Sequence, residues 1–242
     1  MINLYNISKT YNVENHEYVG IKNITLTIQK GDFVAITGRT GSGKTTLMDI
    51  ISMIDRPTFG KYVFENADIS LMDEDAITKM RGKKVGHMYQ KPNFIDGFTV
   101  YQNLETPFLY KNDSQPDVKG KITKVLEDLK ISDKINAKLN SLSRKNQQLL
   151  SLARALLSSE NLIIADEPTG DLNSLETEIV LEEFQRLNAK GVTIVIVTDD
   201  IDIARHSKRV ILLKDGIIEK DINLSNPLSA REIMQKFTKA QG

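Results

Sequence analysis

The sequence has no cysteine among its 242 residues, which excludes disulfides, thiolate metal sites and a cysteine nucleophile. It also has no excess charge of either sign, because 32 basic side chains balance 32 acidic ones. This balance, together with the shortness of the basic pair Lys83-Lys84, indicates no nucleic-acid partner. No apolar run approaches the roughly 20 residues that cross a bilayer, and no secretory signal opens the sequence. A soluble, cytoplasmic chain is predicted.

The sequence alternates short apolar runs with helical patterns. Runs at 33–36, 162–165, 193–197 and 210–213 have the length of strands that a parallel sheet buries on both faces. Apolar residues at helical spacing follow in two places: Leu47, Ile50, Ile51 and Ile54 in a helix from Gly43, and Leu175, Ile179, Leu181, Phe184 and Leu187 in a later helix. The alternation predicts an α/β fold with a parallel sheet.

The predicted organisation is a single domain over residues 1–242. Its α/β core comprises residues 1–95 and 159–228, and the first thirty residues have the alternating pattern of antiparallel strands. Residues 96–158 have helical spacing and no convincing strand, so they are predicted to form a helical subdomain inserted into the core. Residues 229–242 are predicted to form a C-terminal helix.

A glycine-rich segment follows the run at 33–36. Residues 38–45 match the pattern G-x-x-x-x-G-K-[ST], between a predicted strand and a predicted helix. Glycines let backbone N–H groups surround a polyphosphate, and the helix N-terminus adds partial positive charge. Lys44 is predicted to reach the β- and γ-phosphates and Thr45 to bind Mg²⁺. The predicted nucleotide-binding residues here are Gly38, Arg39, Thr40, Gly41, Ser42, Gly43, Lys44, Thr45 and Thr46.

Two carboxylates, Asp166 and Glu167, end the apolar run at 162–165. At a buried strand end, Asp166 is suited to holding Mg²⁺ through water, and Glu167 to polarising an attacking water. The alternative is a strand followed by a solvated acidic turn. The phosphate-binding pattern elsewhere in the chain favours the catalytic interpretation.

With these elements, the sequence resembles the ATP-binding subunits of ABC transporters along nearly its whole length. Tyr11 stands where that family stacks an aromatic ring on adenine, and Gln90 matches a glutamine that contacts Mg²⁺. Leu142-Ser143 lies at the family's signature sequence. The resemblance implies a P-loop ATPase fold, ATP and Mg²⁺ as cofactors, and Thr45, Gln90 and Asp166 at the metal.

Finer motifs resemble one branch of that family: the lipoprotein-release, macrolide-efflux, peptide-resistance and cell-division ATPases. They lie at 68–81, 85–90, 99–105 and 168–170. The resemblance implies a second ABC ATPase subunit, identical or different, and a separate integral membrane, permease-like subunit. The chain is then peripheral, on the cytoplasmic face of the cell membrane. Apolar residues between 94 and 110 form either a groove for that subunit or ordinary subdomain core.

Three positions depart from the family pattern. The signature Leu-Ser-Gly-Gly-Gln is replaced by residues 142–146, in which Arg144 and Lys145 stand for glycines after Ser143. In the family this segment of one subunit closes over the γ-phosphate bound to the other, so the two cations either crowd the phosphate, bind it by charge, or point into solvent. Asp199 stands where a histidine is expected, and an ionised aspartate only accepts hydrogen bonds.

The third departure is in the loop after Glu167. Related chains have Gly-Asn-Leu-Asp where this one has Gly170-Asp171-Leu172-Asn173, so the amide and the carboxylate have exchanged places. In the family this loop crosses the dimer interface, which leaves open whether Asp171 compensates for Asn173.

Three functions follow from the resemblance and its departures. The first is an ATP-hydrolysing subunit that dimerises on ATP and drives export or a mechanical or signalling stroke in a membrane subunit, with attenuated hydrolysis. The second is an ATP-gated regulatory module with little turnover, and the third is a soluble ABC ATPase of a cofactor-assembly scaffold. Retained Glu167 favours the first, whereas Arg144, Lys145 and Asp199 favour the second.

Overall fold

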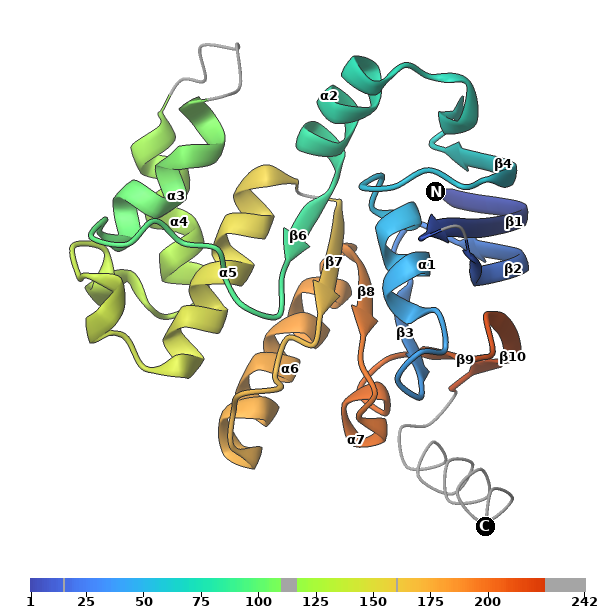
Figure 1. Ribbon diagram of the computed structural model, residues 1–242. Helices are drawn as coiled ribbons and strands as arrows, with labels where there is room; N and C mark the ends of the chain where they lie inside the picture. Colours follow the sequence, from blue (N-terminus) through green and yellow to red (C-terminus); the bar gives the residue numbers. More distant parts are fainter. Residues whose placement is uncertain (15, 110–116, 160, 225–242) are drawn as a thin grey trace.

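The chain folds into two β-sheets, with helices on both sides of the larger one (Figure 1). The computed structural model describes residues 1–14, 16–109, 117–159 and 161–224. The predicted C-terminal helix at 229–242 and the stretch at 110–116, which includes Tyr110, lie outside the described residues.

The larger sheet has six strands in the order β10-β9-β3-β8-β7-β6. All neighbours are parallel except β10 and β9, which form an antiparallel hairpin. The strands are β3 (Phe33–Gly38), β6 (Gly86–Met88), β7 (Leu162–Asp166), β8 (Thr193–Val197), β9 (Arg209–Lys214) and β10 (Ile217–Asn223). The four apolar runs of the sequence are therefore parallel strands, as predicted.

Alternate side chains of these strands enter two different cores. In β7, Leu162 and Ile164 pack into the core that contains α1, whereas Ile163 and Ala165 pack into the core that contains α5 and α6. This is the period-2 geometry of a strand covered on both faces, and it explains why the runs are uninterrupted rather than alternating.

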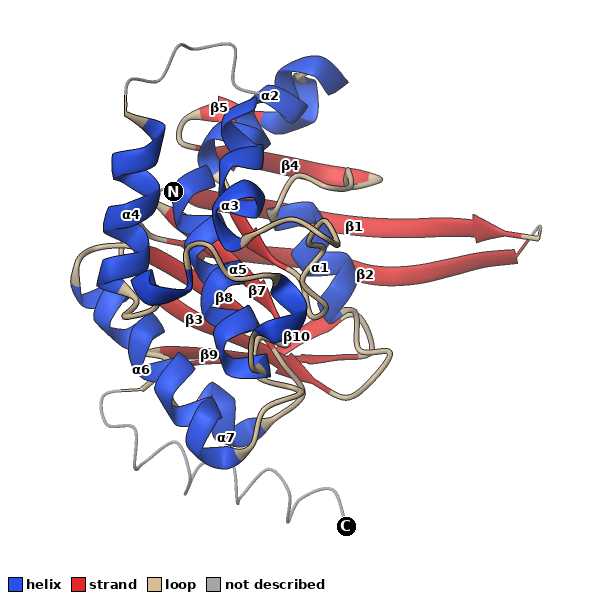
Figure 2. Cartoon of the chain, turned by 90° about the vertical axis from the view of Figure 1, so that its left-hand side faces the viewer, coloured by secondary structure: helices blue, strands red, loops and turns tan. Residues whose placement is uncertain are grey.

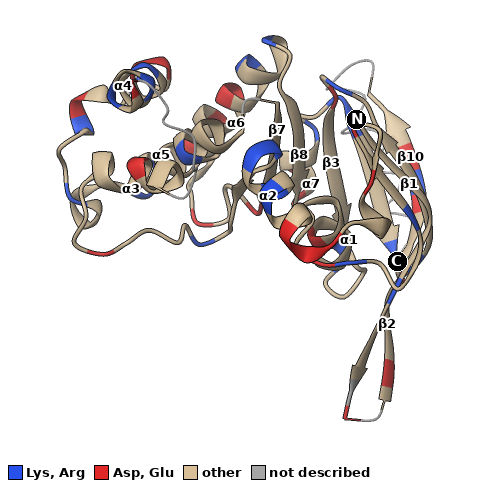
Figure 3. Cartoon of the chain, turned by 90° about the horizontal axis from the view of Figure 1, so that it is seen from above, with Lys and Arg blue, Asp and Glu red and all other residues tan. Residues whose placement is uncertain are grey.

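A smaller antiparallel sheet covers the α1 side. Its order is β2-β1-β4-β5, and its strands are β1 (Ile2–Val13), β2 (His16–Ile28), β4 (Phe59–Phe64) and β5 (Ala67–Asp68). Ile2, Leu4 and Ile7 point inward against α1. The far ends of β1 and β2 project beyond the sheet as a hairpin (Figures 2 and 3). The predicted antiparallel start of the chain is confirmed.

Helices cover both faces of the six-stranded sheet (Figure 1). Their bounds are α1 (Lys44–Ile51), α2 (Glu74–Lys84), α3 (Val100–Leu109), α4 (Val118–Asp128), α5 (Arg144–Ser158), α6 (Ser174–Ala189) and α7 (Ile201–Ala204), with 3₁₀ turns η1 (Ile69–Leu71), η2 (Ser132–Lys134) and η3 (Leu139–Ser141). In the described part of 96–158, α3, α4 and α5 pack together, and the β-structure there is a single bridge between Thr99 and Lys138.

Two apolar residues of the predicted helical patterns are exposed: Ile54, which was predicted in the helix from Gly43 but lies beyond its end, and Leu175, which lies in α6 as predicted. The helix α1 ends at Ile51, because Met53 takes a left-handed conformation, and Ile54 beyond it is 42% exposed. Leu175 lies in α6 but is 73% exposed. At about 100° per residue it stands opposite the buried Phe184, so the helix directs it to solvent.

Candidate nucleotide-binding site

The glycine-rich loop joins β3 to α1, as the sequence predicts. Gly43 caps α1 in a left-handed conformation, with φ 97°. A Cβ at this position would lie 2.6 Å from the carbonyl oxygen of Gly20 and 2.8 Å from Ile21 Cγ2. Only glycine therefore fits both the φ value and the close approach of β2. The loop backbone is thereby set at the N-terminus of α1, where N–H groups are available to an anion.

Two side chains of the loop have the character of phosphate ligands. Lys44 Nζ donates to the carbonyl oxygens of Gly38 at 2.7 Å and Arg39 at 3.2 Å, so its ammonium group lies over the loop. Ser42 is buried, and its Oγ has no hydrogen-bond partner among the described residues. An unpaired buried hydroxyl is costly, and a phosphate oxygen would satisfy it. Thr45, in the first turn of α1, is exposed and accessible to a metal.

Tyr11 lies beside α1, on β1. Its hydroxyl is 3.4 Å from Thr46 Oγ1 and 3.3 Å from Asp55 Oδ2, and Lys9 Nζ lies 5.1 Å from its ring centroid. Lys9 is also ion-paired with Asp55 at 2.7 Å. Tyr11 is thus held next to the first turn of α1, within the same neighbourhood as Thr46.

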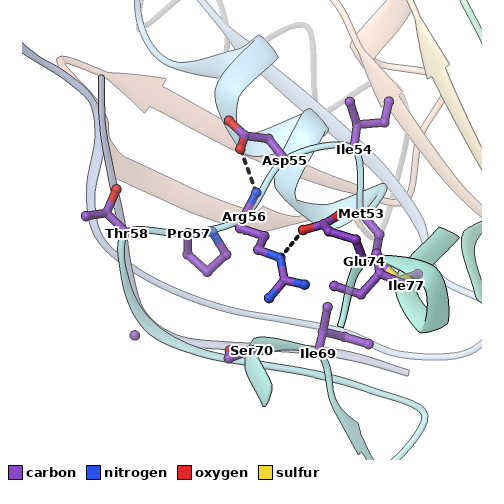
Figure 4. Close-up of a pocket in the computed structure, with 11 residues that line it drawn as sticks. Met53, Ile54, Asp55, Arg56, Pro57, Thr58, Ile69, Ser70, Glu74 and Ile77 are labelled. Carbon is purple, nitrogen blue, oxygen red and sulfur yellow. Dashed lines mark hydrogen bonds and ion pairs between the residues drawn. The ribbon is translucent and has the colours of Figure 1, made fainter. Parts of the chain in front are cut away.

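A hollow of about 340 Å³ opens beyond Asp55. Figure 4 shows Arg56 within it, bonded by its backbone to Asp55 and by its guanidinium to Glu74. Asp55 is ion-paired with Lys9, and Arg56 is ion-paired with Glu74. The hollow adds no group to the phosphate loop.

Asp166 ends β7, two strands from β3 in the sheet. Burial raises the pKa of the Asp166 carboxyl above its usual range, and the Lys44 ammonium partly offsets that rise. Asp49 on α1 also has a raised pKa, from burial and from the charges of Asp55 and Asp166. The phosphate loop and Asp166 are therefore electrostatic neighbours, and oxygen ligands of this kind suit Mg²⁺.

Glu167 is held by the end of the neighbouring strand β8. Its Oε2 accepts from the Thr198 hydroxyl and its Oε1 from the Asp199 backbone N–H, both at 2.9 Å. Its own N–H donates to Val197 O at 2.9 Å, and its backbone takes a left-handed φ of 42°. Burial raises the pKa of the Glu167 carboxyl, with smaller rises from Asp199 and Asp166, although the two hydrogen bonds lower it.

The backbone N–H of Asp199 thus contacts Glu167, and Asp199 is exposed to solvent. Thr198, which holds Glu167, was not singled out by sequence reasoning. Its position directly after the apolar run at 193–197, at the carboxyl edge of the sheet, is the signal that would have found it. Gln90 is exposed and lies two residues beyond Met88, which pairs with Ala165. The register places Gln90 at the same edge as Asp166.

The altered signature segment begins α5. Ser143 caps this helix by accepting from Asn146 N at 3.3 Å. Arg144 is exposed and lies 3.6 Å from Asp171, whereas Lys145 is partly exposed. Within the described residues, no recorded contact joins Ser143, Arg144 or Lys145 to the phosphate loop of the same chain. Asn173 caps α6 and forms a capping box with Glu176.

A second, larger hollow of about 710 Å³ lies away from this edge, between α2, β6, α3 and α5. Its lining includes the cations Lys79, Arg81, Lys83 and Arg154, and no acidic residue lines it within the described part of the chain. The apolar residues between 94 and 110 were expected either to form a groove or to belong to the core of the helical subdomain. Some of them are packed in that core and others are exposed. Phe94 and Phe108 pack against the helical core, while Ile95 and Leu109 are 46% and 71% exposed.

Comparisons with known proteins agree with this geometry. Residues 21–170 match the family described as ABC transporter. The chain is 42% identical over 221 residues to the macrolide export ATP-binding/permease protein MacB of Campylobacter jejuni, covering 91% of this chain and 34% of MacB. It is 38% identical to the ABC transporter ATP-binding protein MJ0796 of Methanocaldococcus jannaschii, covering 93% of this chain and 97% of that one. The chain thus spans about a third of the macrolide exporters that it matches.

Solved structures of MJ0796 have the same fold. A dimeric structure superposes with a TM-score of 0.84 at 36% identity, and it covers 93% of this chain and all of that one. A second is a dimeric post-hydrolysis state bound to ADP and Pi, with a TM-score of 0.83. The predicted fold, the ATPase class and the branch that includes macrolide efflux are confirmed. This chain belongs to the ABC transporter family.

Proposed function

We propose that this chain binds and hydrolyses ATP with Mg²⁺, closes on a second ATPase subunit, and works with a permease-like membrane subunit at the cytoplasmic face of the membrane. The observation that carries the proposal is the meeting of the phosphate loop, Asp166 and Glu167 at the carboxyl ends of β3 and β7, with Thr198, directly after the intervening strand β8, bonded to Glu167. Each of these groups has a place in ATP hydrolysis.

The phosphates would be bound by the loop N–H groups and by Lys44, whose ammonium exchanges the carbonyl oxygens of Gly38 and Arg39 for phosphate oxygens. Ser42 Oγ gains the partner that it lacks. The adenine would stack on Tyr11, which Thr46 and Asp55 hold beside α1. Thr45, Asp166 and Gln90 offer the oxygen ligands that Mg²⁺ prefers. The metal would neutralise charge on the β- and γ-phosphates.

For hydrolysis, a water attacks the γ-phosphorus while the bond to the β-phosphate oxygen breaks, and Glu167 is suited to orient that water and accept its proton. Its raised pKa makes it a better base than an exposed glutamate. Each Glu167 oxygen already accepts one hydrogen bond, from the Thr198 hydroxyl or from the Asp199 backbone N–H, and keeps a second lone pair that can accept from the water. Asp199 adds a carboxylate, where a histidine would donate to the phosphate. We infer attenuated hydrolysis.

The test is steady-state ATPase activity of the chain, compared with Glu167→Gln and Asp199→His. The proposal expects slow turnover that Glu167→Gln abolishes, with ATP binding retained. Asp199→His should raise turnover, because it restores a hydrogen-bond donor. Brisk wild-type turnover that Asp199→His leaves unchanged would contradict the attenuation. Loss of nucleotide binding in Lys44→Ala provides the control for the site itself.

A second candidate function is an ATP-gated regulatory module with little turnover. It is favoured by the Asp199 carboxylate, which cannot donate a hydrogen bond to the γ-phosphate. In that case ATP promotes association of two subunits as strongly in the wild type as in Glu167→Gln, since closure does not depend on hydrolysis. Sedimentation of both proteins with ATP separates the two functions, because an active ATPase accumulates dimers only in the variant.

For the membrane partner, the large hollow between α2 and α5 is the proposed contact, with exposed Ile95 and Leu109 nearby in sequence. Among the described residues, no helix combines the length and apolar character of a membrane span. Copurification with a multispanning membrane protein in detergent is the expected result. Copurification with soluble assembly proteins, and with no membrane protein, would favour the cofactor-assembly scaffold.

A further inference from the structure

Two of the residues that depart from the family pattern contact each other. Arg144 Nη1 lies 3.6 Å from Asp171 Oδ1, although the residues are far apart in sequence and belong to different elements. Arg144 is the first residue of α5, and Asp171 lies in the loop between Glu167 and α6. Their side chains are 69% and 63% exposed, so a partner subunit has access to both.

The first turn of α5 explains why a carboxylate at this point is favourable. A helix N-terminus carries partial positive charge and favours acidic residues. The first turn of α5 contains no acid and instead contains Arg144 and Lys145. The Asp171 carboxylate, supplied by another segment, therefore faces one of the two positive charges that this first turn carries.

The loop that carries Asp171 is fixed at both of its ends. Near Glu167, Gly170 N–H donates to Glu167 O at 3.3 Å. At the other end, Asn173 and Glu176 form the capping box that begins α6. Leu172 N–H also donates to Thr169 O at 3.0 Å. With its backbone held in this way, Asp171 is a defined anchor for Arg144 rather than the tip of a free loop.

We propose that the Arg144–Asp171 pair is a positioning device that sets the spacing between the start of α5 and the loop after Glu167. The two segments then meet a second copy of this chain as one preformed surface. This inference rests on the proposed function, because it assigns the pair to ATP-driven association. Arg144 and Asp171 are positioning residues: they act through Ser143 and through the Glu167 loop.

The size of the effect follows from the exposure of the pair. Exposed ion pairs change an equilibrium constant by about two- to fivefold. A dimer of identical chains contains two such pairs, so their joint loss should weaken association by about four- to 25-fold, the square of the single factor. High salt should produce a similar weakening, because both side chains are exposed to solvent.

The experiment compares the full chain with Arg144→Asp, Asp171→Arg and the exchange Arg144→Asp/Asp171→Arg. ATPase rate is measured against protein concentration, which separates association from turnover. Each single variant should raise the concentration for half-maximal activity about four- to 25-fold. The exchange should restore the wild-type concentration dependence.

A matched control is the pair Lys190–Asp128, at 3.9 Å and 54% and 51% exposed. This pair joins Asp128, the last residue of α4, to Lys190, the C-cap of α6. It therefore lies at the opposite end of α6 from Asp171. Asp128→Lys should leave the concentration dependence unchanged. An equal shift in this control, or an exchange variant as weak as the single variants, would overturn the proposal. The second outcome would mean that Arg144 acts directly on phosphate.

Urea unfolding of the nucleotide-free chain measures the pair without any nucleotide. The four proteins form a double-mutant cycle, in which the unfolding equilibrium constants should show an Arg144–Asp171 coupling of about two- to fivefold. Absence of coupling would overturn the inference, whatever the ATPase result. Failure of the wild type to bind ATP would instead refute the proposed function, so the two failures are distinguishable.

Discussion

His87 provides the sharpest prediction of pH-dependent stability. It lies in β6, at the wall of the large hollow, with its ring stacked on Tyr89 at 4.1 Å between centroids. Its Nε2 is buried without a hydrogen-bond partner among the described residues. Burial, with a smaller contribution from the Arg81 charge, lowers the pKa of His87 from 6.5 to about 4. The fold therefore keeps this imidazole neutral.

The sign and size of the effect follow from linkage. Between pH 6.5 and 4 the unfolded chain binds a proton at His87 and the folded chain does not, so stability falls as pH falls through this range. The contribution is fully present above pH 6.5. It decreases by about 2 kcal/mol on going from pH 7 to pH 5, and by about 3 kcal/mol at pH 4.

The assay is urea unfolding of the wild type and of His87→Phe at pH 7 and pH 5. Phenylalanine keeps a ring beside Tyr89 but removes the titrating group. The wild type should lose about 2 kcal/mol more than the variant over this interval. Equal losses would refute the reasoning, as would an NMR titration of His87 with a midpoint near its ordinary value of about 6.5.

Three further predictions concern Glu167, Asn173 and Phe184. Because burial raises the pKa of Glu167, ionisation of this side chain opposes folding above its ordinary pKa. The urea midpoint of Glu167→Gln, taken relative to that of the wild type, should therefore be higher at pH 7 than at pH 4. The same variant-to-wild-type difference at both pH values would contradict this. Asn173→Ala removes the cap of α6 and should cost about 1 kcal/mol in the same assay, whereas Asn173→Asp, which still caps, should be near neutral. Phe184 is fully buried against the sheet, so Phe184→Ala should lower stability by about 3–5 kcal/mol, and a loss under 1 kcal/mol would show that the core collapses around the deletion.

Much of this fold could be predicted from local patterns. The runs at 162–165 and 193–197 are strands because a sheet covered on both faces needs apolar residues at every position. The phosphate loop was predictable because its glycine spacing has a conformational cause, visible at Gly43. Ile54 was wrongly placed in a helix because apolar spacing does not show where a helix ends, and the exposure of Leu175 shows that an apolar residue within a helix need not face the core.

The contacts between distant segments could not be predicted in the same way. Thr198 holds Glu167 only because β7 and β8 are neighbours, with Asp166 paired to Val197. Arg144 meets Asp171 only because α5 begins beside the loop after β7. No local spacing encodes these meetings, since each depends on how strands are ordered and on how helices pack against them. The sequence indicated the unusual residues, and the fold showed their partners.

The division between buried and exposed positions supports a working site. Asp199, Arg144 and Asp171 are exposed, where substitutions change stability little. Asp166 and Glu167 are partly buried, and burial raises the pKa of both carboxyl groups, so their ionisation carries a cost in stability. Ionisable groups with perturbed pKa values, kept at a cost in stability at the edge where the phosphate loop lies, are typical of a functional site. The groups proposed for catalysis are thus those whose ionisation the fold opposes, whereas the departures at Arg144, Asp171 and Asp199 lie at exposed positions.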